Sequence, residues 1–126
     1  MVTKFPRQQI DLQEKQKSYT DLAIRYIEAN YSQPINISSI ADALHIERTY
    51  LYRLFKERTG MSPKDFLITY RLKRSCSLLT ETTQPIKVIA LSVGYEDALY
   101  FSRLFKHTYH CTPTQYRQSH QLIISS

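Results

Sequence analysis

The chain has little of what β-rich and disulfide-rich proteins use: its 126 residues include two glycines, two cysteines and no tryptophan. Alternating β-branched runs are also few, so an all-α fold is indicated. Two cysteines are too few for a disulfide framework, and neither stands in a Cys-x-x-Cys or Cys/His spacing typical of zinc sites. A reducing, cytoplasmic environment is therefore expected.

Long apolar segments are missing as well. No run approaches the roughly 20 residues that a membrane-spanning helix needs, and the N-terminus has no short apolar core of a signal peptide. Glycine-rich phosphate loops, paired carboxylates and a Ser/His/Asp order are also missing, so no enzyme, cofactor or membrane partner is predicted. His107, His110 and Cys111 are grouped at an expected helix end, but without a fourth ligand they do not predict a metal site.

Positive charge outweighs negative charge in what is present. The 17 Lys and Arg residues against 11 Asp and Glu give a net charge of +6, and the pI is near 9.4. This balance favours an anionic partner such as nucleic acid. The bias is moderate, so charge alone hardly separates a DNA-binding protein from a basic protein without that role.

One short stretch occurs twice. The motif Arg-Leu-Phe-Lys stands at 53–56 and again at 103–106, an offset of 50 residues that is held without a gap over 50–66. Each copy is followed by a hydroxyl residue and proline, at 62–63 and 112–113. A repeat of this period predicts structural units built alike, and two copies are too few for a solenoid. Two small subdomains are therefore predicted.

Periodicity and capping signals predict seven helices. They are expected at about 19–31, from a cap at Ser38 or Ser39 to Leu44, 48–59, 63–79, 86–92, 98–109 and 114–119. Gly60 is expected to end the third helix in the left-handed conformation, and Asp97 to cap the sixth. The apolar face of the first helix is expected to hold Leu22, Ala23, Tyr26, Ile27 and, at its end, Ala29 or Asn30.

A short helix, a tight turn and a second helix form the helix-turn-helix pattern, which is predicted here twice. The expected domains are a flexible linker or tail (1–17), a first helix-turn-helix subdomain (18–61), a linker helix (62–80), a second subdomain (81–119) and a C-terminal tail (120–126). The polar, Gln-rich start favours a C-terminal piece of a longer protein. In that case effector binding and dimerisation are expected in the part that precedes it.

The two repeated helices are expected to present similar outer faces. The inner faces are expected to hold Leu51, Leu54, Phe55 and Arg58 in the first copy and Phe101, Leu104 and Phe105 in the second. The outer faces are expected to hold Thr49, Tyr52, Arg53 and Lys56, and Ala98, Leu99, Ser102, Arg103 and Lys106. Arginine can hydrogen-bond guanine O6 and N7 in the major groove, and lysine can contact a phosphate. Any surface helix of a basic protein shows such residues, but their recurrence at one offset favours DNA recognition.

The motifs then show a resemblance to a known family. In the second copy these are Ile89-Ala90, Val93-Gly94-Tyr95, Asp97, Tyr100-Phe101-Ser102-Arg103-Leu104-Phe105-Lys106, Pro113 and Tyr116-Arg117. The first copy matches more loosely through Tyr50-Leu51, the motif at 53–56, Gly60-Met61-Ser62 and Arg71-Leu72. Over about 22–117 the sequence resembles the DNA-binding domain of the AraC/XylS family of bacterial transcription regulators.

The resemblance implies a pair of homeodomain-like helix-turn-helix subdomains bridged by a long helix. It implies binding to double-stranded promoter DNA, usually with activation of transcription, RNA polymerase as a partner and a nucleoid-associated location in the cytoplasm. Two recognition helices about 34 Å apart would enter successive major grooves. The alternative is a protein–protein adaptor that docks on RNA polymerase or another nucleoid protein, with DNA affinity that is absent or independent of salt.

Site residues follow from the resemblance by position. Base-reading roles are implied for Thr49, Tyr52, Arg53, Ala98, Leu99, Ser102 and Arg103. Phosphate contacts are expected from Arg48, Lys56, Lys73, Arg74 and Lys106. Arg71 has two interpretations: it contacts phosphate, or it pairs with Asp65 or Glu81 and locks the linker helix.

Two departures from the family pattern lie in the second copy. His110 stands where the family usually has glycine, so the second recognition helix is expected to end differently or to be less stable. Ala98 and Leu99 replace more polar residues, and they can contact thymine methyl groups but form no hydrogen bonds to bases. The second copy is therefore expected to read sequence mainly through Ser102 and Arg103, and more weakly than the first.

Overall fold

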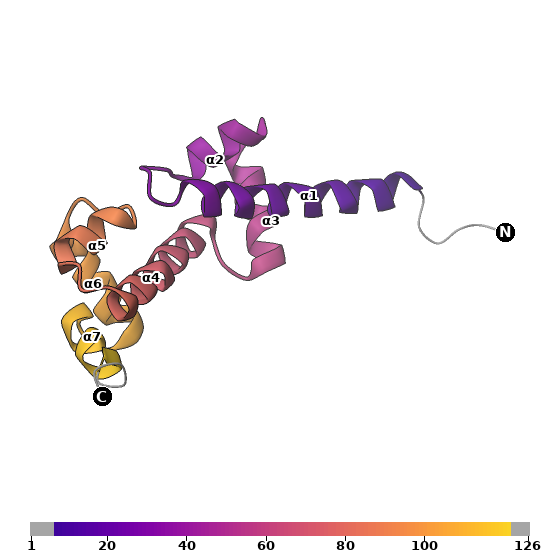
Figure 1. Ribbon diagram of the computed structural model, residues 1–126. Coiled ribbons are helices and arrows are strands. Elements are labelled where there is room, and N and C mark those ends of the chain that lie inside the picture. Colours follow the sequence, from indigo (N-terminus) through magenta and orange to yellow (C-terminus); the bar gives the residue numbers. More distant parts are fainter. Residues whose placement is uncertain (1–6, 122–126) are drawn as a thin grey trace. The chain divides into compact units, whose positions relative to one another are not determined.

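The computed structural model describes residues 7–121, and in this part of the chain every regular secondary-structure element is an α-helix (Figure 1). Its helices are α1 (Arg7–Asn30), α2 (Ile37–Leu44), α3 (Arg48–Thr59), α4 (Pro63–Glu81), α5 (Ile86–Ser92), α6 (Ala98–Tyr109) and α7 (Pro113–Gln121). No strand occurs between residues 7 and 121, so the predicted all-α class is confirmed. None of the described helices has an apolar stretch long enough to cross a bilayer.

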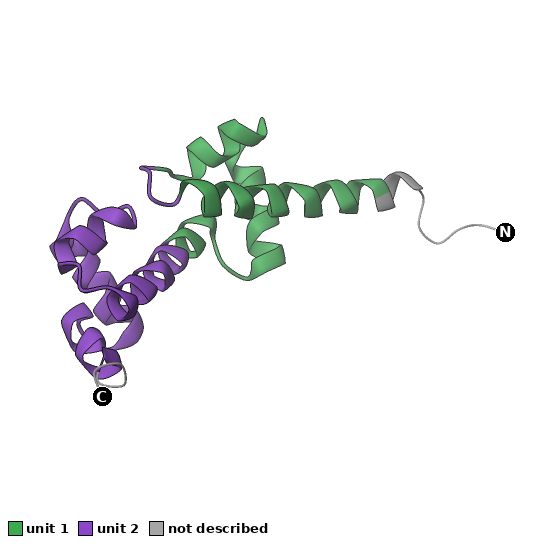
Figure 2. Ribbon diagram, viewed as in Figure 1, with its two compact units in different colours: residues 1–30, 35–67 green, residues 31–34, 68–126 purple. Residues whose placement is uncertain are grey.

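The chain divides into two compact units (Figure 2). Of the described residues, the first unit holds 7–30 and 35–67, and the second holds 31–34 and 68–121. The segment 31–34 therefore belongs to the second unit, although it connects α1 and α2 of the first.

The start of α1 differs from the prediction. The helix begins at Arg7 and not near Tyr19, so residues 7–17, which were expected in a linker or tail, are helical. Gln, Glu and Lys are good helix formers, and neither Pro nor Gly interrupts α1. Arg58 of α3, expected on the inner face, is exposed and donates a hydrogen bond to the carbonyl oxygen of Gln13 at 3.2 Å. The rest of the expected tail, residues 1–6, lies outside the described residues.

The apolar face of α1 is also narrower than predicted. Thr20, Ala23 and Ile27 are buried, whereas Leu22 is 44% exposed and Ala29 is exposed. A helix that crosses only two neighbours buries a single stripe, and Leu22 lies outside that stripe.

The first unit is built from α1, α2 and α3, which pack on one another. Its buried apolar residues are Ala23, Ile27, Ile40, Ala41, Leu51, Leu54 and Phe55. Phe55 meets Phe66 of α4 edge to face, with ring centroids 5.2 Å apart. Burial of each large side chain contributes about 1.5–3 kcal/mol, so the packing of α3 holds its opposite face toward solvent.

The N-cap of α2 is Asn36, and not Ser38 or Ser39 as predicted. The Asn36 side chain accepts a hydrogen bond from the Ser39 backbone N–H at 2.9 Å, and Ser39 Oγ accepts one from the Asn36 N–H at 2.8 Å. This capping box satisfies the backbone N–H groups of Asn36 and Ser39 at once, so the helix begins after Asn36. The α2–α3 turn then passes through His45 with φ of 58°.

Helices α3 and α6 end in the same way. Gly60 (φ 76°) and His110 (φ 64°) are both left-handed, and their N–H groups donate to the carbonyl oxygens of Lys56 and Lys106 at 2.9 and 2.8 Å. The predicted end at Gly60 is confirmed. The helix does not end differently at His110, because histidine adopts the left-handed conformation despite its steric cost. The alternative expectation, that this helix is less stable, stays a prediction.

The second unit has a core of its own, formed by Leu72, Leu79, Ile89, Ala90, Val93, Tyr95, Phe101 and Phe105. Helix α4 runs two residues further than predicted, to Glu81, and α7 ends at Gln121. Arg117 of α7 donates hydrogen bonds to the carbonyl oxygens of Leu79 and Thr82 at 3.0 and 3.3 Å, which satisfies acceptors left open at the end of α4. The predicted tail beyond 121 lies outside the described residues.

Arg71 is buried, so both interpretations of it are wrong. Its Nε donates to the Tyr31 carbonyl oxygen at 2.7 Å and its Nη2 to the Gln33 carbonyl oxygen at 2.8 Å. The guanidinium also lies over the Tyr95 ring, 5.0 Å from its centroid. Backbone oxygens replace the expected carboxylate partners, and the arginine ties the 31–34 segment to the second unit.

Candidate nucleic-acid interface

The outer face of α3 is formed as the helical periodicity predicts. Leu51, Leu54 and Phe55 turn into the core of the first unit. The opposite side leaves four side chains exposed: Thr49, Tyr52, Arg53 and Lys56. Tyr52 is 46% exposed, which is unusual for a large aromatic residue on a helix that has a core to pack against.

Aromatic contacts support one of these side chains. The Arg53 guanidinium lies over the ring of Tyr50, 5.5 Å from its centroid. The half-buried Tyr50 ring meets Tyr19 of α1 edge to face, with centroids 6.3 Å apart and an interplanar angle of 77°. Sequence reasoning missed this role of Tyr50 and Tyr19. The i, i+3 spacing of Tyr50 and Arg53 was a usable signal, whereas the contact with Tyr19 depends on tertiary packing.

The start of α6 is fixed by Asp97, as predicted. Its Oδ1 accepts hydrogen bonds from the backbone N–H groups of Leu99 and Tyr100 at 2.9 and 3.2 Å. Phe101 and Phe105 are fully buried, so the helix turns its other side outward.

The outer face of α6 carries Leu99, Arg103 and Lys106, all exposed. Leu99 is 72% exposed, the largest exposed fraction among the exposed large hydrophobic residues of the described chain. Ser102 is half-buried. Ala98 was expected on this face, but it is half-buried and packs against the core of the second unit. The base-reading role of Ala98 stays a prediction.

The five residues expected to contact phosphate are all exposed: Arg48, Lys56, Lys73, Arg74 and Lys106. Lys73 and Arg74 lie in the part of α4 that belongs to the second unit. The Arg74 guanidinium lies over the Tyr31 ring at 5.9 Å, and its hydrogen bond with Tyr31 is the main cause of its raised pKa.

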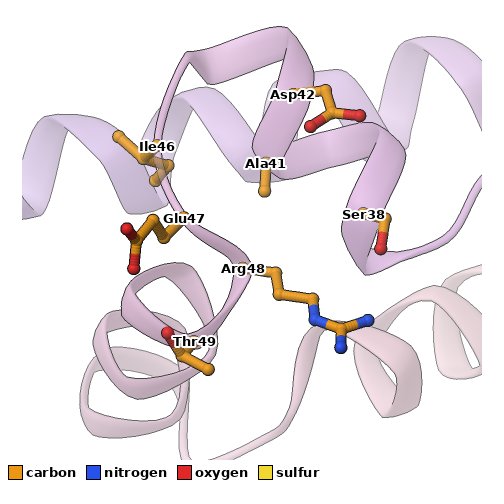
Figure 3. Close-up of a pocket in the computed structure, with 7 residues that line it drawn as sticks. All are labelled: Ser38, Ala41, Asp42, Ile46, Glu47, Arg48 and Thr49. Atoms are coloured by element: carbon orange, nitrogen blue, oxygen red, sulfur yellow. The ribbon is translucent and has the colours of Figure 1, made fainter.

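Arg48 opens α3 beside a cavity of about 430 Å³ between α2 and α3 (Figure 3). The cavity is also lined by Ser38, Asp42, Glu47 and Thr49. Figure 3 shows Glu47 and Arg48 pointing in opposite directions from the start of α3. The carboxylates of Asp42 and Glu47 disfavour an anion inside the cavity, so a phosphate would meet Arg48 on the side away from Glu47.

Tyr100 is a second residue that sequence reasoning passed over. It occupies the position equivalent to Tyr50 and is 43% exposed. Its ring meets Tyr95 edge to face at 5.9 Å. Among residues 7–121, Arg103 stacks on no aromatic ring, so the two copies differ in how they hold the repeated arginine.

The histidines and cysteines form no comparable site. Within the described part of the chain, no group of three or more His, Cys, Asp and Glu side chains is placed to hold a metal ion. His107 and His110 are exposed, and Cys111 packs against the core of the second unit.

Comparison with known proteins finds a matching family model and similar regulatory proteins. A family model described as a helix-turn-helix domain matches residues 40–119. The chain is 30% identical over 122 residues to the Msm operon regulatory protein of Streptococcus mutans, covering 96% of this chain and 44% of that protein. It is 33% identical over 117 residues to the lactose operon transcription activator of Staphylococcus xylosus, covering 90% of this chain and 41% of that protein. The chain thus spans less than half the length of these relatives.

Among solved structures, the chain is similar to the C-terminal domain of AraT, a response regulator from Geobacillus stearothermophilus. The TM-score is 0.79 at 34% sequence identity, and the match covers 80% of this chain and 84% of that domain.

Proposed function

The chain belongs to the AraC-type family of helix-turn-helix transcription regulators, and from this membership we propose that it binds a promoter site in double-stranded DNA through α3 and α6. The family model describes a helix-turn-helix domain, and the two relatives reported above are named as a regulatory protein and a transcription activator. The observation that carries the proposal is the repeat in three dimensions. Phe55 and Phe105 are both fully buried, and Arg53 and Arg103 at the same offset are both exposed.

The proposal assigns base contacts to the outer faces of the two helices. Thr49, Tyr52 and Arg53 read one half of the site, and Leu99, Ser102 and Arg103 read the other. Each arginine donates two hydrogen bonds to a guanine, and Leu99 contacts a thymine methyl group. Half-buried Ala98 contributes at most a minor contact. Arg48, Lys56, Lys73, Arg74 and Lys106 neutralise phosphates.

The two helices are proposed to enter successive major grooves of one site, as helix-turn-helix pairs do. In this arrangement residues 18–61 and 81–119 act as the two subdomains, 62–80 as the linker helix, and the regulator is held at the nucleoid. Five base pairs inserted between the half-sites turn one half by about half a helical repeat. Binding should then fall to that of a single half-site, whereas ten inserted base pairs should restore the angle but not the distance.

A gel shift with a site selected by the wild-type protein tests the assignment of the arginines. Arg53→Ala and Arg103→Ala should each lower affinity by about 1–3 kcal/mol and relax preference at one base pair. Arg25→Ala is the matched control, because it removes the same charge from an exposed position on α1. Lys56→Ala should weaken all sequences alike and reduce the salt slope by about 1. Full preference in both folded arginine variants would refute the proposal.

A different surface supports a second candidate function, contact with RNA polymerase. In the second unit, a groove of about 500 Å³ is lined by the apolar residues Pro34, Leu91 and Tyr100 and by the acidic residues Glu96 and Asp97. Leu91 is exposed, and no lysine or arginine lines the groove. Such a surface repels DNA phosphates and suits a protein partner.

The variants Leu91→Asp and Glu96→Lys separate the two functions. Both residues are exposed, so the fold should tolerate these changes. If the groove contacts polymerase, transcription in vitro should fall in both variants. DNA affinity should change only by what the charge explains, downward in Leu91→Asp and upward in Glu96→Lys. Unchanged transcription in both variants would leave DNA binding as the only function assigned to the second unit.

A further inference from the structure

The side chains of Tyr19, Tyr50 and Arg53 form a row of contacts in the first unit, with the two rings edge to face and the guanidinium over the Tyr50 ring. Tyr50 has one neighbour on each side: the Tyr19 ring at 6.3 Å and the Arg53 guanidinium at 5.5 Å. The two tyrosines are half-buried, whereas Arg53 is exposed. An exposed arginine normally samples many rotamers, and ordering it on binding is costly. A ring beneath the guanidinium reduces that cost because it limits the sampling before DNA arrives.

We infer that Tyr50 is a positioning residue for base recognition: with Tyr19 behind it, Tyr50 holds Arg53 in the orientation that meets a guanine. The inference rests on the proposed function, and it adds a residue that does not touch DNA to the specificity of the first half-site. The guanidinium of Arg53 can donate to guanine O6 and N7 while one face rests on the ring, since hydrogen bonding uses the edge of the group and stacking uses its face.

The second copy provides an internal comparison. Tyr100 stands at the position equivalent to Tyr50, but its ring contacts Tyr95 and not Arg103. The repeated arginine is therefore supported in one copy only. On this ground we expect α3 to discriminate guanine more strongly than α6 does.

The stack can be tested first in the free protein. Ring currents from Tyr50 should shift the side-chain proton and Nε–H resonances of Arg53 upfield, and the shift should disappear in Tyr50→Leu. Tyr50→Phe should keep it, because the ring remains. The same substitution in the second copy, Tyr100→Leu, should leave the Arg103 resonances unchanged. Arg53 resonances that do not respond to Tyr50→Leu would overturn the inference whether or not the chain binds DNA.

The effect on recognition is measured with the selected site, in which each guanine is replaced singly by 7-deazaguanine, which lacks the N7 acceptor. The guanine read by Arg53 is the one whose replacement weakens binding of the wild-type protein but has no effect on binding of Arg53→Ala. Tyr50→Leu should lower affinity for the intact site about two- to fivefold, which corresponds to 0.5–1 kcal/mol. It should also reduce the effect of 7-deazaguanine at that position only. Tyr50→Phe should behave as wild type.

A double-mutant comparison separates positioning from general destabilisation. In the Arg53→Ala background, Tyr50→Leu should have no further effect on affinity. An equal loss in both backgrounds, or an equal loss at both half-sites, would show that Tyr50 supports only the fold and would overturn the inference. The proposed function fails in another way: Arg53→Ala itself then keeps full affinity and preference. Circular dichroism and urea unfolding of Tyr50→Leu and Tyr19→Leu establish that the variants are folded.

Discussion

Replacement of Gly94 by alanine is expected to be far more damaging than the same change at Gly60. Both glycines have positive φ, 105° at Gly94 and 76° at Gly60, so alanine is strained at either site. A Cβ atom at Gly60 would meet nothing within 4 Å. At Gly94 it would lie 2.7 Å from the Tyr31 carbonyl oxygen and 2.8 Å from Arg71 Nε, inside van der Waals contact. These are the atoms of the hydrogen bond that joins the 31–34 segment to α4.

The magnitude follows from adding the two effects. Strain of alanine in the left-handed region is about 1–2 kcal/mol, and this is all that Gly60→Ala should lose. Gly94→Ala should also lose the hydrogen bond from the buried Arg71 guanidinium, about 1.5–3 kcal/mol. The sum of about 2.5–5 kcal/mol is a large share of the roughly 5–15 kcal/mol that stabilises a typical domain.

Urea unfolding followed by far-UV circular dichroism measures both variants, because the chain has no tryptophan to report on unfolding. Arg71→Met is a useful third variant, since it removes this hydrogen bond without backbone strain, together with the one to the Gln33 carbonyl oxygen. If Gly94→Ala is no less stable than Gly60→Ala, the contact between Arg71 and Tyr31 does not carry the energy assigned to it. DNA binding by α6 should fall with the stability of the second unit.

Three further results are expected. When deoxyuridine replaces a thymine read by Leu99, affinity for the site should fall about fourfold in gel shifts, equivalent to the roughly 0.8 kcal/mol of one methyl group. Leu99→Ala should abolish that difference between the two DNAs. His110→Gly should stabilise the protein by about 0.5–1 kcal/mol in urea unfolding, because relief of left-handed strain exceeds the added entropy of the unfolded chain; a loss of stability would contradict the strain assigned to His110. Burial raises the pKa of Tyr109 above its ordinary value of 10.0. The protonated phenol should therefore contribute its full share to the free energy of unfolding below about pH 10, and this share should decline as pH rises further. Tyr109→Phe should reduce the decline, as measured by thermal unfolding at a series of pH values.

The sequence predicted best those elements whose ends carry a local signal. The bounds of α3, α5 and α6 agree with the predicted ones because Gly60, Asp97 and the proline before α5 mark them chemically. The start of α1 carried no such mark. Its first half is polar and lacks apolar contrast, so periodicity could not distinguish a solvent-exposed helix from a tail.

Long-range partners were the other limit of sequence reasoning. Arg71 hydrogen-bonds carbonyl oxygens 40 and 38 residues away, and every residue type has such an oxygen. Charge pairing therefore suggested Asp65 and Glu81, which are near in sequence, whereas the partners of Arg71 are backbone oxygens. The outward faces of α3 and α6 were predictable because they are the complement of a buried apolar stripe. Which of their side chains would be supported by a neighbour was not.

The repeat in the sequence thus predicts the packing of α3 and α6 better than it predicts the bases that their outer faces contact. Phe55 and Phe105 occupy equivalent, fully buried positions, and any change there would disturb a packed core. The outer faces meet no such restriction, and they differ: α3 has a stacked arginine beside Thr49 and Tyr52, whereas α6 has an arginine without a ring beneath it beside an exposed Leu99. Hydrogen bonds from a pre-ordered guanidinium discriminate bases more sharply than an apolar contact with one methyl group. It follows that the half-site read by α3 should tolerate fewer base changes than the half-site read by α6, even though the two helices share one motif.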